Sequence, residues 1–317
     1  MNKKIRLSII FSILFISAHA QDLIKSGPMV GYSTMQEVLL WVQTDEKAKV
    51  HFEYYEIDNP KIRFKTDNKD TDKKSGYVAK LIADQVTPGK KYKYEIFIND
   101  LKVERDYVME FQSQKLWKWR TDPPDVSFVI GSCSYVNEPQ FDRPGKPYGN
   151  NFEIFNSIHS KNPDFMLWLG DNTYLREPDW NSRTGFINRY SHTRALAELQ
   201  PLLASTHHYA TWDDHDFGPN NSDGSFWLKE TASEIFKLFW GNPNYDVTGK
   251  GGITGFFQWG DLDFFLMDNR YHRTSNNNFT EDRQLLGKDQ IDWLINALSF
   301  SQAPFKFIAI GGQVLSS

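Results

Sequence analysis

The order of apolar and polar residues changes near residue 121, and this change constrains the fold more than any other feature of the chain. Before it, apolar and polar residues alternate in short runs such as residues 50–54 and 92–98. A period of two with one polar face predicts antiparallel strands, and clusters of Asp, Asn, Pro and Gly between the runs predict turns. We therefore predict an antiparallel β-sandwich, of the fibronectin or immunoglobulin kind, over residues 21–122.

The second half of the chain has a different pattern, in which continuous apolar runs alternate with segments of helical periodicity. Residues 127–130 predict a short apolar strand, and residues 165–169 have the composition of a strand buried on both faces. Residues 183–204 have helical character. Alternating strands and helices predict an α/β domain over residues 123–317.

The first twenty residues predict a secretory signal peptide. Three basic residues precede a short apolar run over residues 7–16, and Ala18-His19-Ala20 has the small-x-small pattern after which a signal peptidase cleaves. The run is too short to cross a bilayer, which takes roughly 20 residues; an uncleaved anchor and a buried helix are the alternatives. We expect a secreted or periplasmic protein, with no integral membrane segment once residues 1–20 are removed.

The composition narrows the classes of function. Hydrophobic residues make up 40% and charged residues 24% of the 317 residues, as in ordinary soluble globular proteins. One cysteine cannot form a disulfide within its own chain. The net charge is −4 and there is no dense run of Lys and Arg, so no nucleic-acid binding is expected, because that needs a concentrated basic face.

Polar side chains follow four apolar segments of the second half, each at the point where a predicted strand ends. They are Cys133, Asp171, the acidic cluster at residues 213–216, and residues 268–270. In open α/β sheets, ligands bind beyond the carboxyl ends of the strands. We therefore expect these groups to converge on one site.

These groups have the chemistry of metal ligands, although each has a simpler alternative. Asp171 can bridge two cations and Tyr174 offers a hard phenolate suited to Fe³⁺, or else the pair forms an ordinary turn and a packed ring. Three carboxylates within residues 213–216 repel one another unless cations or water neutralise them, so the cluster is either a site or a solvated loop. Cys133 is either a metal ligand or a small buried hydrophobe.

Together the motifs resemble alkaline phosphatase D, the PhoD-like metallophosphatases. The resemblance rests on Gly-Ser-Cys ending at residue 133, Leu-Gly-Asp-x-x-Tyr over residues 169–174, Trp-Asp-Asp-His-Asp over residues 212–216 and Asp-x-Arg over residues 268–270. The Gly-Asp-x-x-Tyr element is also similar to that of purple acid phosphatases, and PhoD-like proteins carry a β-sandwich ahead of the catalytic domain. The resemblance implies a secreted alkaline phosphatase or phosphodiesterase that contains Fe³⁺ and Ca²⁺.

The resemblance also implies roles for single residues. By their positions in the motifs, Cys133 and Tyr174 would ligate the iron, and Asp171 would bridge the metals. Asp214 stands where related phosphoesterases have a metal-binding Asn, and His215 stands where they have an active-site His.

A mechanism follows from these charges. A metal-bound hydroxide would attack phosphorus, while His215 stabilises or protonates the leaving oxygen. Arg270 has the planar fork that suits two phosphate oxygens, and Arg273 is a further candidate. The expected partner is a small or polymeric phosphate ester, a monoester or a diester.

Three expectations qualify this interpretation. In the metallophosphoesterase pattern a loop carrying Gly-Asp-x-His follows the last strand seen here, and the sequence ends at Ser317 without it, so we expect an incomplete catalytic domain. An inactive or degenerate phosphatase-like binding protein, without stoichiometric iron, is the alternative function. A hydrolase with Ser132 as nucleophile is a third class, but no Gly-x-Ser-x-Gly motif surrounds that residue.

Overall fold

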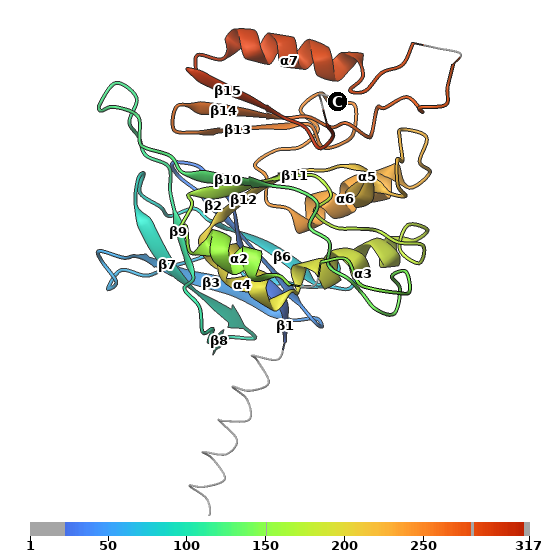
Figure 1. The fold of residues 1–317 in the computed structure, drawn as a ribbon. Helices are drawn as coiled ribbons and strands as arrows, with labels where there is room; N and C mark the ends of the chain where they lie inside the picture. The colour runs from blue at the N-terminus through green and yellow to red at the C-terminus, as the bar shows by residue number, and fades with distance from the viewer. Residues whose placement is uncertain (1–22, 150, 280–281, 314–317) are drawn as a thin grey trace, which may run out of the picture.

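The computed structural model describes residues 23–149, 151–279 and 282–313, so the predicted signal peptide lies outside the described residues. Its centre is a six-stranded sheet with the order β10-β11-β12-β1-β2-β6 (Figure 1). The strands from β10 to β1 are parallel, whereas β2 is antiparallel to both β1 and β6. The strands are β10 (Phe128–Gly131), β11 (Phe165–Leu169), β12 (His207–Thr211), β1 (Ile24–Ser33), β2 (Val38–Thr44) and β6 (Val78–Ala83).

A second sheet makes the N-terminal part rich in antiparallel strands, as predicted. Its long strands pair over their whole length, with Phe52 opposite Ile96 and Tyr54 opposite Tyr94. The alternating apolar residues of both strands, Val50 and Phe52 among them, pack against the β1-β2-β6 half of the central sheet. The strands are β3 (Lys49–Glu56) and β7 (Lys91–Ile98), with the short β4 (Phe64–Lys65), β5 (Lys69–Asp70), β8 (Leu101–Val103) and β9 (Glu110–Gln112) at their edges.

The two halves of the chain share the central sheet. β1 pairs in parallel with β12, with Val30 opposite His207. The backbone N–H of Ser33 donates to the Tyr209 hydroxyl at 3.1 Å. The regions that differ in sequence pattern are therefore joined by main-chain and side-chain hydrogen bonds, which the pattern did not predict.

A third sheet packs face to face on strands β10 to β12. It consists of β13 (Gly255–Trp259), β14 (Leu262–Leu266) and β15 (Phe305–Ala309), with β13 and β14 antiparallel and β14 and β15 parallel. Aromatic rings fill the space between the two sheets: Tyr209 stacks on Phe257 with ring centroids 3.7 Å apart, and Phe257 stacks on Phe264 at 4.6 Å. This rigid core holds the ends of β10, β11 and β12 in place.

Helices cover the opposite face of the central sheet (Figure 1). Phe186, Leu202 and Phe236 of these helices belong to one buried apolar cluster with Trp41 of β2 and with Trp212. On the third sheet, α7 (Lys288–Phe300) lies over the face turned away from the central sheet (Figure 1). The other helices are α2 (Glu153–His159), α3 (Arg183–Arg194), α4 (Gln200–Ser205), the four-residue α5 (Asp214–Phe217) and α6 (Lys229–Phe239).

The helical segment predicted over residues 183–204 is two helices. The backbone leaves helical geometry at Ala195, where ψ is 0°. Pro201 lies in the first turn of α4, where a residue without an N–H removes no hydrogen bond of the helix. Within the described residues, no helix combines the length and the apolar character needed to cross a membrane.

Candidate metal centre

The loops that follow β10 and β11 lie side by side at one edge of the sheet. The backbone N–H of Cys133 donates to the carbonyl of Gly170 at 3.1 Å, and that of Ser134 donates to the carbonyl of Asp171 at 2.9 Å. Cys133 and Asp171 both have positive φ, 59° and 52°, a region that costs a residue with a side chain about 1–3 kcal/mol. Gly170 has a φ of 89°, and the position requires glycine, because a Cβ there would lie 2.8 Å from the backbone N of Asp213.

Three of the predicted ligands meet at this edge. The Sγ of Cys133 lies 3.8 Å from Oδ2 of Asp171, and the hydroxyl of Tyr174 donates to the same oxygen at 3.3 Å. Cys133 is exposed, so the alternative of a small buried hydrophobe is wrong. Burial, together with the charges of Asp214 and Asp213, raises the pKa of the Asp171 carboxyl to about 7, and burial also raises the pKa of the Tyr174 phenol.

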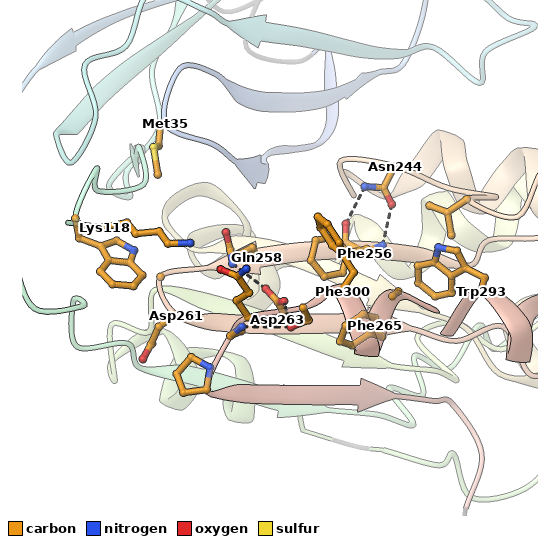
Figure 2. Close-up of a pocket in the computed structure, with 18 residues that line it drawn as sticks. Met35, Lys118, Asn244, Phe256, Gln258, Asp261, Asp263, Phe265, Trp293 and Phe300 are labelled. Atoms are coloured by element: carbon orange, nitrogen blue, oxygen red, sulfur yellow. Dashed lines mark hydrogen bonds between the residues drawn. The ribbon is translucent and has the colours of Figure 1, made fainter. Parts of the chain in front are cut away.

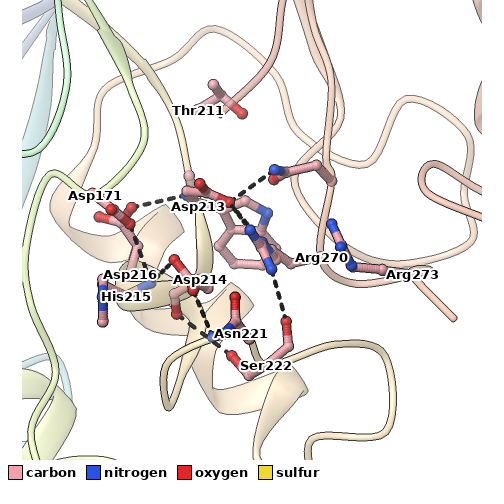
Figure 3. Close-up of polar contacts among 12 residues, drawn as sticks. Asp171, Thr211, Asp213, Asp214, His215, Asp216, Asn221, Ser222, Arg270 and Arg273 are labelled. Carbon is pink, nitrogen blue, oxygen red and sulfur yellow. Dashed lines mark hydrogen bonds and ion pairs between the residues drawn. The ribbon is translucent and has the colours of Figure 1, made fainter. Parts of the chain in front are cut away.

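The acidic cluster after β12 adds two more predicted residues. Ligand atoms of Asp171, Asp214 and His215 lie within 4.8 Å of one another. The backbone N–H of His215 donates to Oδ1 of Asp214 at 3.0 Å and to Oδ1 of Asp171 at 3.3 Å (Figure 3). The imidazole of His215 contacts the ring of Tyr174, with ring centroids 4.5 Å apart, and burial lowers the pKa of His215.

The remaining acids of the cluster have structural partners. Asp216 is fully buried and accepts backbone N–H groups from Asn172, Thr173 and Asp213 at 3.0–3.1 Å. It therefore ties the loop after β11 to the start of α5. Burial raises its pKa well above the usual value. Because its carboxylate is buried and hydrogen-bonded to the backbone, Asp216 is not available as an exposed ligand.

Arg270 lies beside the cluster but is bound to Asp213. Its Nε donates to Oδ1 of Asp213 at 2.6 Å, its Nη2 pairs with the same carboxylate, and its Nη1 donates to the carbonyl of Ser222 at 3.2 Å (Figure 3). Arg270 is only 6% exposed. Arg273 is placed next to it in Figure 3 and is less buried.

Sequence reasoning assigned no role to two groups at the site; the first, Asn269, was expected there only as part of residues 268–270. Asn269 is fully buried and its Nδ2 donates to Asp213 at 2.8 Å, while its Oδ1 has no hydrogen-bond partner among the described residues. Its position inside the Asp-x-Arg motif was the available signal.

The second missed group is an ionic network that supports Tyr174. The Arg176 guanidinium lies over the rings of Tyr135 (4.9 Å) and Tyr174 (5.4 Å), and its Nε donates to Asp142 at 3.1 Å. Asp142 is also bridged, at 3.3 Å, by the buried Arg189. Asp142 lies 34 positions from Arg176 and 47 from Arg189, so no local pattern could reveal these contacts.

The residues present fit a cation centre. The Nδ1 of His215 is buried and has no hydrogen-bond partner among the described residues, an arrangement that is costly unless a ligand satisfies the atom. Burial, and then the neighbouring charges of Asp214 and Asp213, raise the pKa of Asp171, and a bound cation would offset both effects. A thiol, a phenol, carboxylates and an imidazole together form a donor set for transition metals and hard cations.

Comparison with known proteins finds similarity to phosphatases. Residues 241–315 match the PhoD-like phosphatase family, and residues 21–116 match a domain of unknown function, DUF7800. A solved structure of PhoD superposes on 91% of this chain with a TM-score of 0.73 and 19% identity. The purple acid phosphatase PPD1 from yellow lupin (Lupinus luteus) seeds superposes on 90% of it with a TM-score of 0.59 and 12% identity.

The chain thus shares its fold with the PhoD and purple acid phosphatase structures, and the predicted resemblance to the PhoD-like phosphatases is confirmed. The chain spans 62% of the PhoD structure and 51% of the lupin structure. No curated protein matches the sequence. The predicted boundaries between the sandwich and the catalytic domain, and the predicted incompleteness of that domain, remain predictions.

Proposed function

We propose that this protein is a secreted or periplasmic, metal-dependent phosphoesterase that hydrolyses phosphomonoesters, phosphodiesters or both. The observation that carries the proposal is the convergence of Cys133, Asp171, Tyr174, Asp214 and His215, which come from three separate loops. Five potential ligands from three loops at the carboxyl ends of parallel strands are the expected form of a binding site in such a sheet.

The donor set supports Fe³⁺ and Ca²⁺ as the metals. Cys133 and Tyr174 would hold the iron, since thiolate and phenolate suit it, and the carboxylates of Asp171 and Asp214 suit a harder ion such as Ca²⁺. Asp171, which contacts both sets, would be shared. The bound cations would supply positive charge to the phosphoryl oxygens and would acidify a water to hydroxide near neutral pH.

The protein's own groups supply the remaining steps. His215 is predominantly neutral at pH 7, because burial lowers its pKa, and it would act on the leaving oxygen through a hydrogen bond. Of the five N–H donors of Arg270, three have partners in Asp213 and Ser222. The other two would contact phosphoryl oxygens, so that Arg270 would both anchor Asp213 and bind substrate.

The test combines metal analysis with hydrolysis of p-nitrophenyl phosphate and bis(p-nitrophenyl) phosphate. The wild-type protein should contain stoichiometric metal and hydrolyse at least one ester. Asp171→Asn should lose metal and lower kcat/KM by about a hundredfold or more. Ser132→Ala is the matched control on the same loop as Cys133 and should retain both metal and activity.

Other results would reject the proposal. A wild-type protein that contains no stoichiometric metal after supply of iron and calcium would favour the degenerate, phosphatase-like binding protein. Loss of activity in Ser132→Ala, with metal content unchanged, would favour a serine nucleophile.

A further inference from the structure

A cavity of about 660 Å³ opens on the outer face of the third sheet, away from the metal centre. Phe256 and Phe265 line it, while their neighbours in the chain, Phe257 and Phe264, face the core between the sheets. Figure 2 shows Met35 and Lys118 on one side and Asn244 and Trp293 on the other. None of the residues of the candidate metal centre lines the cavity, so it is a separate site.

One wall of the cavity is a row of aromatic rings. Ring centroids of Phe256 and Phe265 are 5.2 Å apart, and those of Phe265 and Trp293 are 6.1 Å apart. Phe300, at the end of α7, also lines the cavity and is 88% exposed. A solvent-exposed aromatic ring next to an open aromatic wall is typical of a binding surface.

Two polar side chains of the cavity, Asp263 and Gln258, are held by hydrogen bonds. Asp263 is only 4% exposed, and its carboxylate accepts hydrogen bonds from Nε2 of Gln258 at 2.9 Å and from the Ser301 hydroxyl at 2.6 Å (Figure 2). Because the amide nitrogen of Gln258 is bound to Asp263, its Oε1 is left as an acceptor. Asp261 and Lys118 add an acceptor and a donor to the lining.

We propose that this cavity binds a short neutral saccharide. The apolar faces of sugar rings stack on aromatic side chains, and sugar hydroxyls donate to Gln258 and Asp261 and accept from Lys118. The volume lies within the roughly 300–1,000 Å³ of small-ligand pockets. The inference goes beyond the proposed phosphoesterase activity and does not depend on it.

The charges of the lining favour a neutral ligand over an ion. Two carboxylates, Asp261 and Asp263, oppose a phosphate or other anion, because like charges repel at short range. The ammonium of Lys118 opposes an organic cation on the same grounds. A polyol forms hydrogen bonds with Asp261 and Lys118 without either repulsion.

Isothermal titration calorimetry of the whole protein with maltotriose, cellotriose and triacetylchitotriose tests the inference. At least one trisaccharide should bind with a Kd on the order of 1 mM or tighter. Phe300→Ala should weaken that binding about tenfold, and Gln258→Leu should weaken it similarly. Phe300 is exposed, so its replacement should not affect folding. Trp227→Ala removes an equally large exposed ring outside the cavity and should bind as wild type does.

Three results would overturn the inference. The first is no binding of any of the three trisaccharides by the wild-type protein. The second is unchanged binding in both Phe300→Ala and Gln258→Leu. The third is tetraethylammonium or inorganic phosphate binding to the wild-type cavity at least as tightly as the sugars. Because binding is measured directly, a protein that hydrolyses no ester still answers the question.

Discussion

At the scale of the residue, the candidate centre depends on a few side chains in unusual surroundings. Cys133 and Asp171 adopt positive φ, and Asp171 receives hydrogen bonds from Tyr174 and from the backbone of His215. Held in this way, the carboxylate is presented to the thiol, the phenol and the imidazole at once. The strained backbone is tolerated because hydrogen bonds between the two loops fix it.

Replacement of Cys133 by Ser tests the assignment of the thiol. We expect the variant to bind less than about half the iron of the wild-type protein and to lose the visible absorption of a thiolate–iron bond, because a hydroxyl is a weaker ligand for Fe³⁺. Metal analysis and absorption spectroscopy measure both effects. Iron content equal to that of the Ser132→Ala control would remove Cys133 from the ligand set.

Replacement of Arg270 by Ala tests the proposed phosphate contact. The substitution removes two unengaged N–H donors and leaves Asp213 with Asn269 as its remaining side-chain donor. We expect kcat/KM to fall about tenfold to a hundredfold, mainly through KM, while metal content is retained. Steady-state kinetics with metal analysis distinguishes this from loss of the centre; full activity would exclude Arg270 from the site.

At the scale of the element, His207 of β12 links three strands from both halves of the chain. The contact of its Nδ1 with the Gly31 carbonyl is 2.8 Å, and its Nε2 accepts from the Gln112 N–H at 3.2 Å. This pair of partners requires the neutral imidazole, with the proton on Nδ1. Burial lowers the pKa of His207 to about 4.

The pH dependence of stability follows from that pKa. The folded-state pKa lies below the unfolded value of 6.5, so the unfolded state takes up the proton first as the pH falls. The stabilisation that the neutral His207 contributes is complete above pH 6.5. Between pH 6.5 and pH 4 the free energy of unfolding falls by about 3 kcal/mol. Chemical denaturation across this range measures the free energy of unfolding. Its dependence on pH should be shallower for His207→Gln than for wild type. The partly exposed His159→Gln should keep the wild-type slope.

At the scale of the whole molecule, the N-terminal strands are part of the sheet that supports the site. β1 lies between β12 and β2, and its removal would leave β12 as an unpaired edge next to a buried apolar face. The β-rich N-terminal part is therefore structurally continuous with the strands that carry the site.

A chain that lacks residues 1–122 tests this integration. We expect it to be insoluble or to lack a cooperative unfolding transition, because the exposed edge of β12 and the open apolar face favour aggregation. Circular dichroism and size-exclusion chromatography, with the whole chain produced in parallel, measure the difference. A soluble monomer with a sharp unfolding transition would show that the C-terminal part folds alone.

The sequence by itself determined the local structure and most of the candidate site. Alternation with period two predicted the antiparallel strands of the N-terminal part, and apolar runs that end in polar residues placed Cys133, Asp171 and residues 213–216 at strand ends. Both signals are local, since the backbone period and the residues that follow a strand lie within a few positions of each other. The resemblance to PhoD-like phosphatases depended on the same short segments.

Only the tertiary structure decided what these segments contact. It paired β1 with β12, hydrogen-bonded Asp216 to backbone N–H groups of the loop after β11, paired Arg270 with Asp213 and placed Arg176 over Tyr135. Each of these contacts joins residues far apart in the chain or chooses between identical side chains a few positions apart. Composition and periodicity carry no information on long-range contacts or on which of several identical side chains is buried. Both are set by how the three sheets pack.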